Sequence, residues 1–239
     1  VAVLMKKDKA AYLALYDREG NSLAEGEIHG QNGGYPIAIA LSNDAVKLAV
    51  SMININEGSV KSTIAFYNYG TVGQNEIDHC VGVNNYDDMV IPEMEFTSND
   101  RMVVFGDTKA VIFEGAQKPQ AIAEIPMDEK TKSIFYNEHY IGIVTGNEDE
   151  AVTNHLAVYD ENGKLVMEKD FGLDYSSIEF LTNNEICIRN ANVCDIYTVH
   201  GVYKFHHEFE EELFEIIPGK LKLNYTLVLK DTTQRIRLK

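Results

Sequence analysis

Three glutamates recur at one position of a repeated pattern, and they are the residues that most directly suggest chemistry. Each stands four residues before an Asn or Gly that begins a turn: Glu95, Glu179 and Glu215. Two other copies of the pattern hold Ile39 and Ser133 at this position. Carboxylates that lie close together repel one another, which raises their pKa values or recruits a cation. The pattern predicts a site for calcium, another hard cation or a cationic ligand. The alternative is that these acids meet water or pair with Lys and Arg.

Short β-strands are the elements that must position these acids. Val, Ile, Tyr, Phe and Thr recur in short runs bounded by Asn, Asp and Gly, and long stretches of helical period are missing. The phrase Tyr16-Asp17-Arg18-Glu19-Gly20 follows one such run, and Tyr159-Asp160-Glu161-Asn162-Gly163 follows another. Self-similarity at a period of about 40 residues predicts a repeat architecture. We therefore expect an all-β fold, a β-propeller of four-stranded antiparallel blades, with a β-sandwich as the alternative.

The repeats divide the chain into about six blades within a single domain over residues 1–239. A partial unit at residues 1–30 lacks its innermost strand, and five four-stranded units follow it. In the last unit we expect the third strand at 226–229 and the outer strand at 235–238. Because the chain starts at Val1 in strand-like sequence without an initiator Met, we expect upstream residues to be missing. The first strand of each blade lines the channel of a propeller, which would place Glu95, Glu179 and Glu215 around it.

The repeated phrase resembles the blade hairpin of the WD40-like and quinoprotein-like propeller superfamily. The Trp-Asp dipeptide and the quinoprotein Trp are absent, because the chain contains no Trp. Residues such as those from Tyr159 to Leu165 are similar to bacterial, membrane-anchored, extracytoplasmic β-propellers of unknown function, and the similarity runs along nearly the whole chain. The resemblance implies a domain at the extracytoplasmic face of the cell envelope. It also implies that any membrane attachment uses an upstream anchor absent from this chain.

The charge balance restricts the partners. There are 21 basic and 37 acidic residues, which gives a net charge of −16. Such a surface repels phosphate backbones and anionic membranes, so we expect no nucleic-acid partner. No run approaches 18 apolar residues, and no signal-peptide pattern is visible.

Cys187 and Cys194 flank the segment Arg189-Asn190-Ala191-Asn192 and could form a disulfide. Strand pairing symmetric about Asn190 and Ala191 would set the two cysteines directly opposite each other, at a spacing that depends on the loop type. The alternative is that both pack as buried thiols. The third cysteine, Cys80, completes no disulfide framework or zinc spacing.

The remaining motifs do not indicate catalysis. His206 and His207 point to opposite faces if they lie in a strand, so they cannot easily bind one ion. Neither a Gly-x-Ser-x-Gly elbow nor a Cys-His pair is present. We therefore predict a non-catalytic binding or scaffold propeller without a catalytic or cofactor-binding residue. Its partner would be a protein or small extracellular ligand, contacted by loops at 84–91 and 146–154. The alternatives are an enzyme that processes carbohydrate or peptide with paired carboxylates at the channel mouth, and a structural spacer.

Overall fold

The computed structural model describes residues 1–7, 10–28, 34–56, 58–70, 79–127, 130–146 and 154–237. Its regular elements are β-strands that pair with their neighbours in the sequence. The chain divides into two compact units, Val1–Glu129 (unit 1) and Lys130–Lys239 (unit 2). In the described part of the chain, no helix has the length and apolar composition of a membrane-spanning segment.

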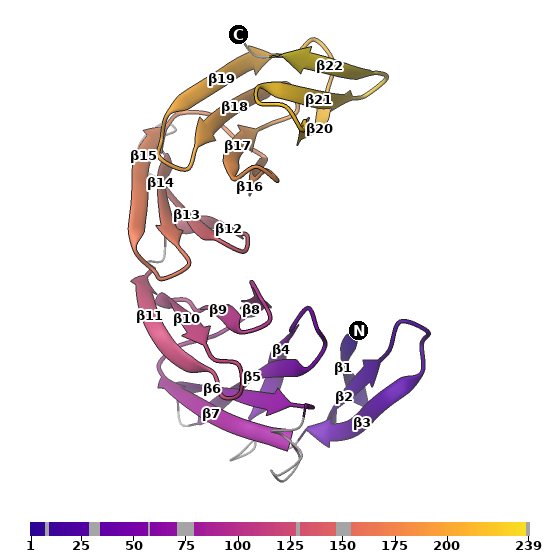
Figure 1. Cartoon of the computed structure of the whole chain (residues 1–239). Coiled ribbons are helices and arrows are strands. Elements are labelled where there is room, and N and C mark those ends of the chain that lie inside the picture. Colours follow the sequence, from indigo (N-terminus) through magenta and orange to yellow (C-terminus); the bar gives the residue numbers. More distant parts are fainter. Residues whose placement is uncertain are drawn as a thin grey trace. The chain divides into compact units, whose positions relative to one another are not determined.

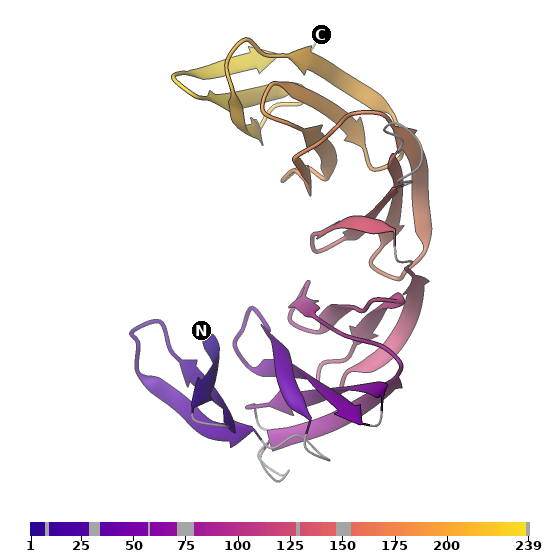
Figure 2. The same cartoon turned by 180° about the vertical axis from the view of Figure 1, so that it is seen from behind.

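Unit 1 contains three antiparallel sheets in its described part (Figure 1). The first sheet consists of β1 (Ala2–Lys7), β2 (Ala10–Tyr16) and β3 (Ser22–Ile28). The second consists of β4 (Tyr35–Leu41), β5 (Lys47–Asn56), β6 (Ser59–Asn68) and β7 (Cys80–Asp87). The third consists of β8 (Glu93–Phe96), β9 (Arg101–Phe105), β10 (Lys109–Glu114) and β11 (Gln120–Pro126). The views from the front and from behind agree that these sheets follow one another in unit 1 (Figure 2).

Unit 2 repeats the same construction. Its first sheet consists of β12 (Thr131–Tyr136), β13 (Tyr140–Gly146), β14 (Asn154–Asp160) and β15 (Leu165–Phe171). Its second consists of β16 (Ser177–Phe180), β17 (Glu185–Arg189), β18 (Val193–Thr198) and β19 (Tyr203–Glu208). Its third consists of β20 (Leu213–Pro218), β21 (Asn224–Leu229) and β22 (Thr233–Arg237). Four consecutive strands per sheet are the blade construction predicted from the repeats.

The repeated turn phrase has the same geometry in both units. Asp17 accepts hydrogen bonds from the backbone N–H groups of residues 19 and 21, at 2.9 and 2.8 Å. Asp160 does the same for residues 162 and 164, at 2.9 Å each. Gly20 and Gly163 adopt positive φ angles of 85° and 75°, which favour glycine. The Asp side chain and the Gly backbone therefore explain why Asp-x-x-Gly recurs at these turns.

A bulge accompanies the pairing of the last two strands in five sheets. The register shifts at residues 15/16, 66/67, 112/113, 158/159 and 196/197. In every case the second residue is aromatic, either Tyr or Phe. Because a bulge increases the twist of the bulged strand, its recurrence gives the sheets a common shape.

The core is divided among the interfaces between consecutive sheets. In unit 1, one cluster includes Phe66 of β6 and Phe113 of β10, with ring centroids 5.2 Å apart. Another packs Leu13 and Leu15 of β2 against Leu48 of β5. Unit 2 has equivalent clusters between its first and second sheets and between its second and third sheets. Burial between neighbours is how a repeat architecture is stabilised.

The last sheet differs from the prediction. Residues 226–229 lie in β21, the second strand of this sheet rather than the third, and β22 is its third strand. The structure describes four four-stranded sheets, and the sheets at the two ends of the chain have three strands each. Residues 219–223 form the connection between β20 and β21, which is as long as residues 42–46 between β4 and β5, and they contain no strand. The expected loop at 84–91 is also shorter, because residues 84–87 belong to β7, and residues 147–153 of the other loop lie outside the described residues.

Candidate functional site

The three predicted glutamates lie on the first strands of their sheets, as expected. Glu95 is on β8 of unit 1, whereas Glu179 on β16 and Glu215 on β20 belong to unit 2. Glu179 lies near Arg189, with 3.7 Å between Oε1 and Nε. Glu215 is exposed. No group of three or more His, Cys, Asp or Glu residues is arranged to hold a metal ion within the described ranges. The cation site at these glutamates remains a prediction.

Glu95 is the candidate whose ionisation is disfavoured. Partial burial, reinforced by repulsion from Glu93, raises the pKa of Glu95. A carboxyl group whose pKa is raised in the folded state binds its proton more tightly there than in the unfolded chain. Its contribution to stability is therefore present below the pKa of the unfolded state and is lost as the pH rises through the pKa of the folded state.

The substitution Glu95→Gln is expected to raise the melting temperature at neutral pH, because it removes a carboxylate that the fold disfavours. At about pH 3, where the carboxyl is protonated in both states, the two proteins should melt alike. Thermal denaturation at both pH values measures the difference. The control is Glu25→Gln on β3, an exposed acid in the same unit. An equal rise for both variants, or a rise that persists in acid, would contradict this origin.

The structure places Cys187 and Cys194 as free, buried thiols with their Sγ atoms 3.6 Å apart. The symmetric pairing expected from the sequence is wrong, since Cys187 lies opposite Ile196 and Cys194 opposite Arg189. The pairing is centred between residues 191 and 192, one residue beyond the expected centre, which makes the cysteines diagonal rather than direct neighbours. The hydrogen bond with Cys194 raises the pKa of Cys187, and burial raises it further. Both side chains belong to the core between the last two sheets.

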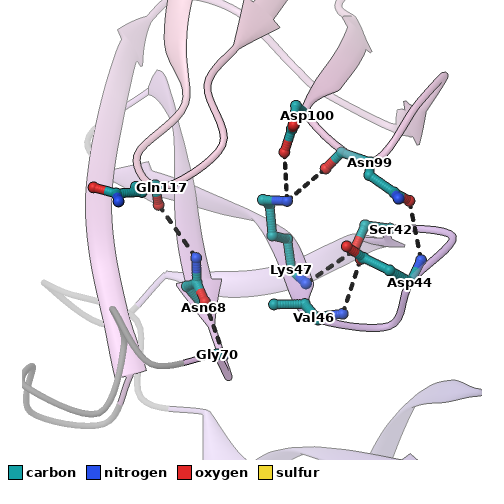
Figure 3. A network of polar contacts seen from close by, with 9 residues as sticks. All are labelled: Ser42, Asp44, Val46, Lys47, Asn68, Gly70, Asn99, Asp100 and Gln117. Atoms are coloured by element: carbon teal, nitrogen blue, oxygen red, sulfur yellow. Dashed lines mark hydrogen bonds and ion pairs between the residues drawn. The ribbon is translucent and has the colours of Figure 1, made fainter.

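In unit 1, a buried lysine joins two consecutive sheets. Lys47 is the first residue of β5, and its Nζ donates to the carbonyl of Asn99 and to Asp100 Oδ1, each at 2.7 Å (Figure 3). Its side chain is only 7% exposed. The backbone N–H of Asp44 also donates to Asn99 Oδ1 at 3.1 Å. The turn before β5 is thereby fixed to the turn before β9.

Unit 2 holds an equivalent cluster with a different charge at the same position. Glu185 is the first residue of β17 and is buried. It accepts hydrogen bonds from Lys204 of β19 and, at 2.5 Å, from the Tyr225 hydroxyl of β21. Lys204 also donates to Tyr225, at 3.2 Å. Burial opposes protonation of Lys204, but the bonds to Glu185 and Tyr225 outweigh it and raise the pKa of this lysine. Burial, followed by the bond to Glu185, raises the pKa of Tyr225.

These two clusters were not recognised in the sequence. The signal was present, because a charged residue opens the second strand and three apolar residues follow it in both cases, as at Lys47 and at Glu185. Asp100 lies 53 residues from Lys47 and Tyr225 lies 40 residues from Glu185, beyond the sheet of each, so spacing along the chain does not reveal these contacts. Turn asparagines make a similar link in unit 2, where Asn137 Nδ2 donates to Asn184 Oδ1 at 2.8 Å.

An apolar groove lies between β19 and the last sheet of unit 2, with a volume of about 510 Å³. Its floor includes Leu227, Leu229 and Ile236. The ring of His207 contacts Phe205 and Phe209 on either side, with centroids at 5.9 and 4.6 Å. Glu210 and Glu211 line one end. His206 points to the other face of β19, where Nδ1 lies 2.7 Å from Asp195 Oδ1. The two adjacent histidines therefore do not share a site, as predicted.

The sheet construction and the repeated turns define this chain as a β-propeller. The WD40 domain of Neurospora crassa Pan2 superposes with a TM-score of 0.51 at 6% identity, covering 98% of this chain and 73% of that one. The propeller domain of the trilobed protease from Pyrococcus furiosus gives 0.48 at 10% identity, covering 85% and 70%. BBS1N in complex with ARL6DN gives 0.48 at 13% identity, covering 99% and 77%. At such identities the likeness shows the fold alone.

The chain belongs to the family described as "Family of unknown function (DUF5711)", whose model matches residues 1–238. A comparison with curated proteins finds no match. The family membership agrees with the expectation of a propeller of unknown function.

Proposed function

We propose that this protein is a non-catalytic binding propeller at the extracytoplasmic face of the cell envelope. The location follows from the resemblance to anchored bacterial propellers. The charged clusters at Lys47 and Glu185 connect consecutive sheets and make the scaffold rigid. A rigid scaffold supports the binding role, because its other surfaces can bind a partner.

The observation that carries the proposal is the apolar groove of unit 2. Its aromatic and aliphatic floor, with Phe205, His207 and Ile236, suits apolar side chains that alternate along an extended peptide. The carboxylates of Glu210 and Glu211 at one end suit Lys or Arg on that peptide. We therefore propose a protein partner that presents an extended segment of alternating basic and apolar residues.

Fluorescence anisotropy with a labelled peptide of alternating Lys and Val residues tests this role. We expect it to bind, and a peptide of alternating Glu and Val not to bind. His207→Ala removes the ring between Phe205 and Phe209 at an exposed position and should weaken binding about tenfold. Glu210→Gln should also weaken binding, whereas Glu215→Gln on β20 is the charge-matched control. Equal binding of the two peptides, or equal effects of the two Glu→Gln changes, would refute the proposed role of the groove.

A further inference from the structure

The charge of this acidic protein is unevenly distributed along the chain. Residues 220–239 contain six Lys or Arg and one Asp, a net charge of +5. Since the whole chain carries −16, residues 1–219 carry −21. Six of the 21 cationic side chains therefore lie in the last 20 residues, which belong to unit 2.

The antiparallel strands gather most of these cations at one end of the last sheet. Asn224, which begins β21, lies opposite Arg237 at the end of β22. Arg235 and Arg237 therefore lie beside the connection of residues 219–223, which carries Lys220 and Lys222. These four side chains are exposed, and no ion pair is recorded for them within the described residues. The hydrogen bond from Lys204 to Tyr225 brings the adjacent end of β19 to the same place.

The same end exposes large apolar side chains. Leu221, between the two lysines, is 71% exposed. Val202 and Tyr203, at the turn that precedes Lys204, are 61% and 53% exposed. A cavity of about 510 Å³ lies between the two sheets here and is lined by Asn183, Lys204, Lys220, Lys222 and Asn224, among others. Glu185 also lines it, but its carboxylate is engaged by Lys204 and Tyr225.

Five acids of these two sheets gather at the other end. Glu208, Glu210, Glu211 and Glu212 lie at or beside the connection between β19 and β20, and Asp231 lies in the turn between β21 and β22. Since β20 and β21 run from this end to the basic end and back, the strands separate the two charges along their length. One end of this surface therefore carries cations and exposed apolar residues, and the other carries carboxylates. Such a surface turns its basic end toward a negatively charged plane.

We propose that the basic end of unit 2, formed by Lys220, Leu221, Lys222, Arg235 and Arg237 with Val202 and Tyr203, docks on an anionic phospholipid bilayer. Leu221 enters the headgroup region with Val202 and Tyr203 beside it, because exposed apolar side chains gain by leaving water. The four cations bind lipid phosphates, and their aliphatic stems lie along the interface. The acidic end faces away from the bilayer. Arg237 also lines the groove, but the other residues of the docking surface do not.

Vesicle co-sedimentation tests the docking surface. The protein is mixed with vesicles of phosphatidylcholine, or of phosphatidylcholine with phosphatidylglycerol, at low and high salt. We expect binding to the anionic vesicles, a loss of binding at high salt, and no binding to phosphatidylcholine alone. Lys222→Gln should weaken binding about fivefold, and Lys220→Gln/Lys222→Gln more strongly. Leu221→Ser should weaken it at low salt, although it leaves the charge unchanged.

The matched control is Lys230→Gln, which removes the same charge at the opposite end of the same sheet and should leave binding unchanged. All substituted side chains are exposed, and circular dichroism verifies that the variants fold. Equal binding to both kinds of vesicle, no binding to either, or equal effects of Lys222→Gln and Lys230→Gln would overturn the proposal. So would full binding by Leu221→Ser. Displacement by inorganic phosphate at matched ionic strength would identify a soluble-anion site instead of a bilayer.

Discussion

The variant Lys204→Met is expected to lower the free energy of unfolding of unit 2 by about 2 to 3 kcal/mol. Met keeps the apolar stem of Lys204 but removes its ammonium group, which leaves the buried Glu185 carboxylate without its cation. The Tyr225 hydroxyl alone then satisfies that carboxylate. Because the side chain of Lys204 is 20% exposed, water can relieve part of the penalty, and we expect a value below that of a fully buried pair.

A second variant separates the lost ion pair from lost packing. Lys204→Met/Glu185→Gln replaces the unpaired carboxylate with a neutral side chain and should recover part of the loss. Lys164→Met, at an exposed turn of unit 2, is the control. Urea unfolding followed by tyrosine fluorescence gives the free energies, and hydrogen exchange shows that the loss lies in unit 2. If the double variant were less stable than Lys204→Met, an unpaired charge would not be the cause.

The variant Phe113→Ala is expected to destabilise unit 1 by about 3 to 5 kcal/mol. Phe113 is fully buried, and its ring lies against Phe66 of the preceding sheet. Removing the ring opens a cavity at the interface that holds the β4–β7 and β8–β11 sheets together. In repeat proteins, the interfaces between neighbouring repeats are the source of stability. The loss of stability for Phe113→Ala should therefore exceed the loss for a substitution on the outer face of a single sheet.

The control for this variant is Ile122→Ala on β11, where the side chain is 44% exposed. We expect it to change the free energy of unfolding by no more than about 0.5 kcal/mol. Urea unfolding of both variants measures the difference. A loss below about 1 kcal/mol for Phe113→Ala would show that the interface repacks around the missing ring.

Local sequence determined the elements of this fold. Asp-x-x-Gly predicts its turn because one carboxylate and one positive φ angle are enough to form it, as at Asp160 and Gly163. Short runs of Val, Ile, Tyr, Phe and Thr bounded by Asn, Asp and Gly predict strands such as β14 (Asn154–Asp160). Both signals depend on residues within a few positions of one another. For the same reason, the six sheets and the position of Glu95, Glu179 and Glu215 on first strands follow from the repeat.

Long connections and strand register could not be predicted in the same way. Gly219 begins the expected turn, but Leu221 and Leu223 alternate with lysines as in a strand, so the last sheet was assigned one strand too many. The pairing of β17 with β18 is centred between residues 191 and 192 rather than between 190 and 191, which shifts Cys187 and Cys194 to diagonal positions. A change of one residue in a turn changes every pair in the following strands.

The amino-acid sequence by itself determined the repeat, the all-β propeller class, the net charge of −16 and the strand on which each candidate acid lies. Tertiary structure alone decided which charged residues are buried together. Lys47 meets Asp100, and Glu185 meets Tyr225, because consecutive sheets pack against each other. Glu185 meets Lys204 because β17 and β19 lie in one sheet. It also decided where the charges gather, since antiparallel strands bring Lys222 and Arg237 to one end of a sheet and leave Glu210 at the other. Net charge is a sum over the chain, whereas binding depends on the local field that the fold creates.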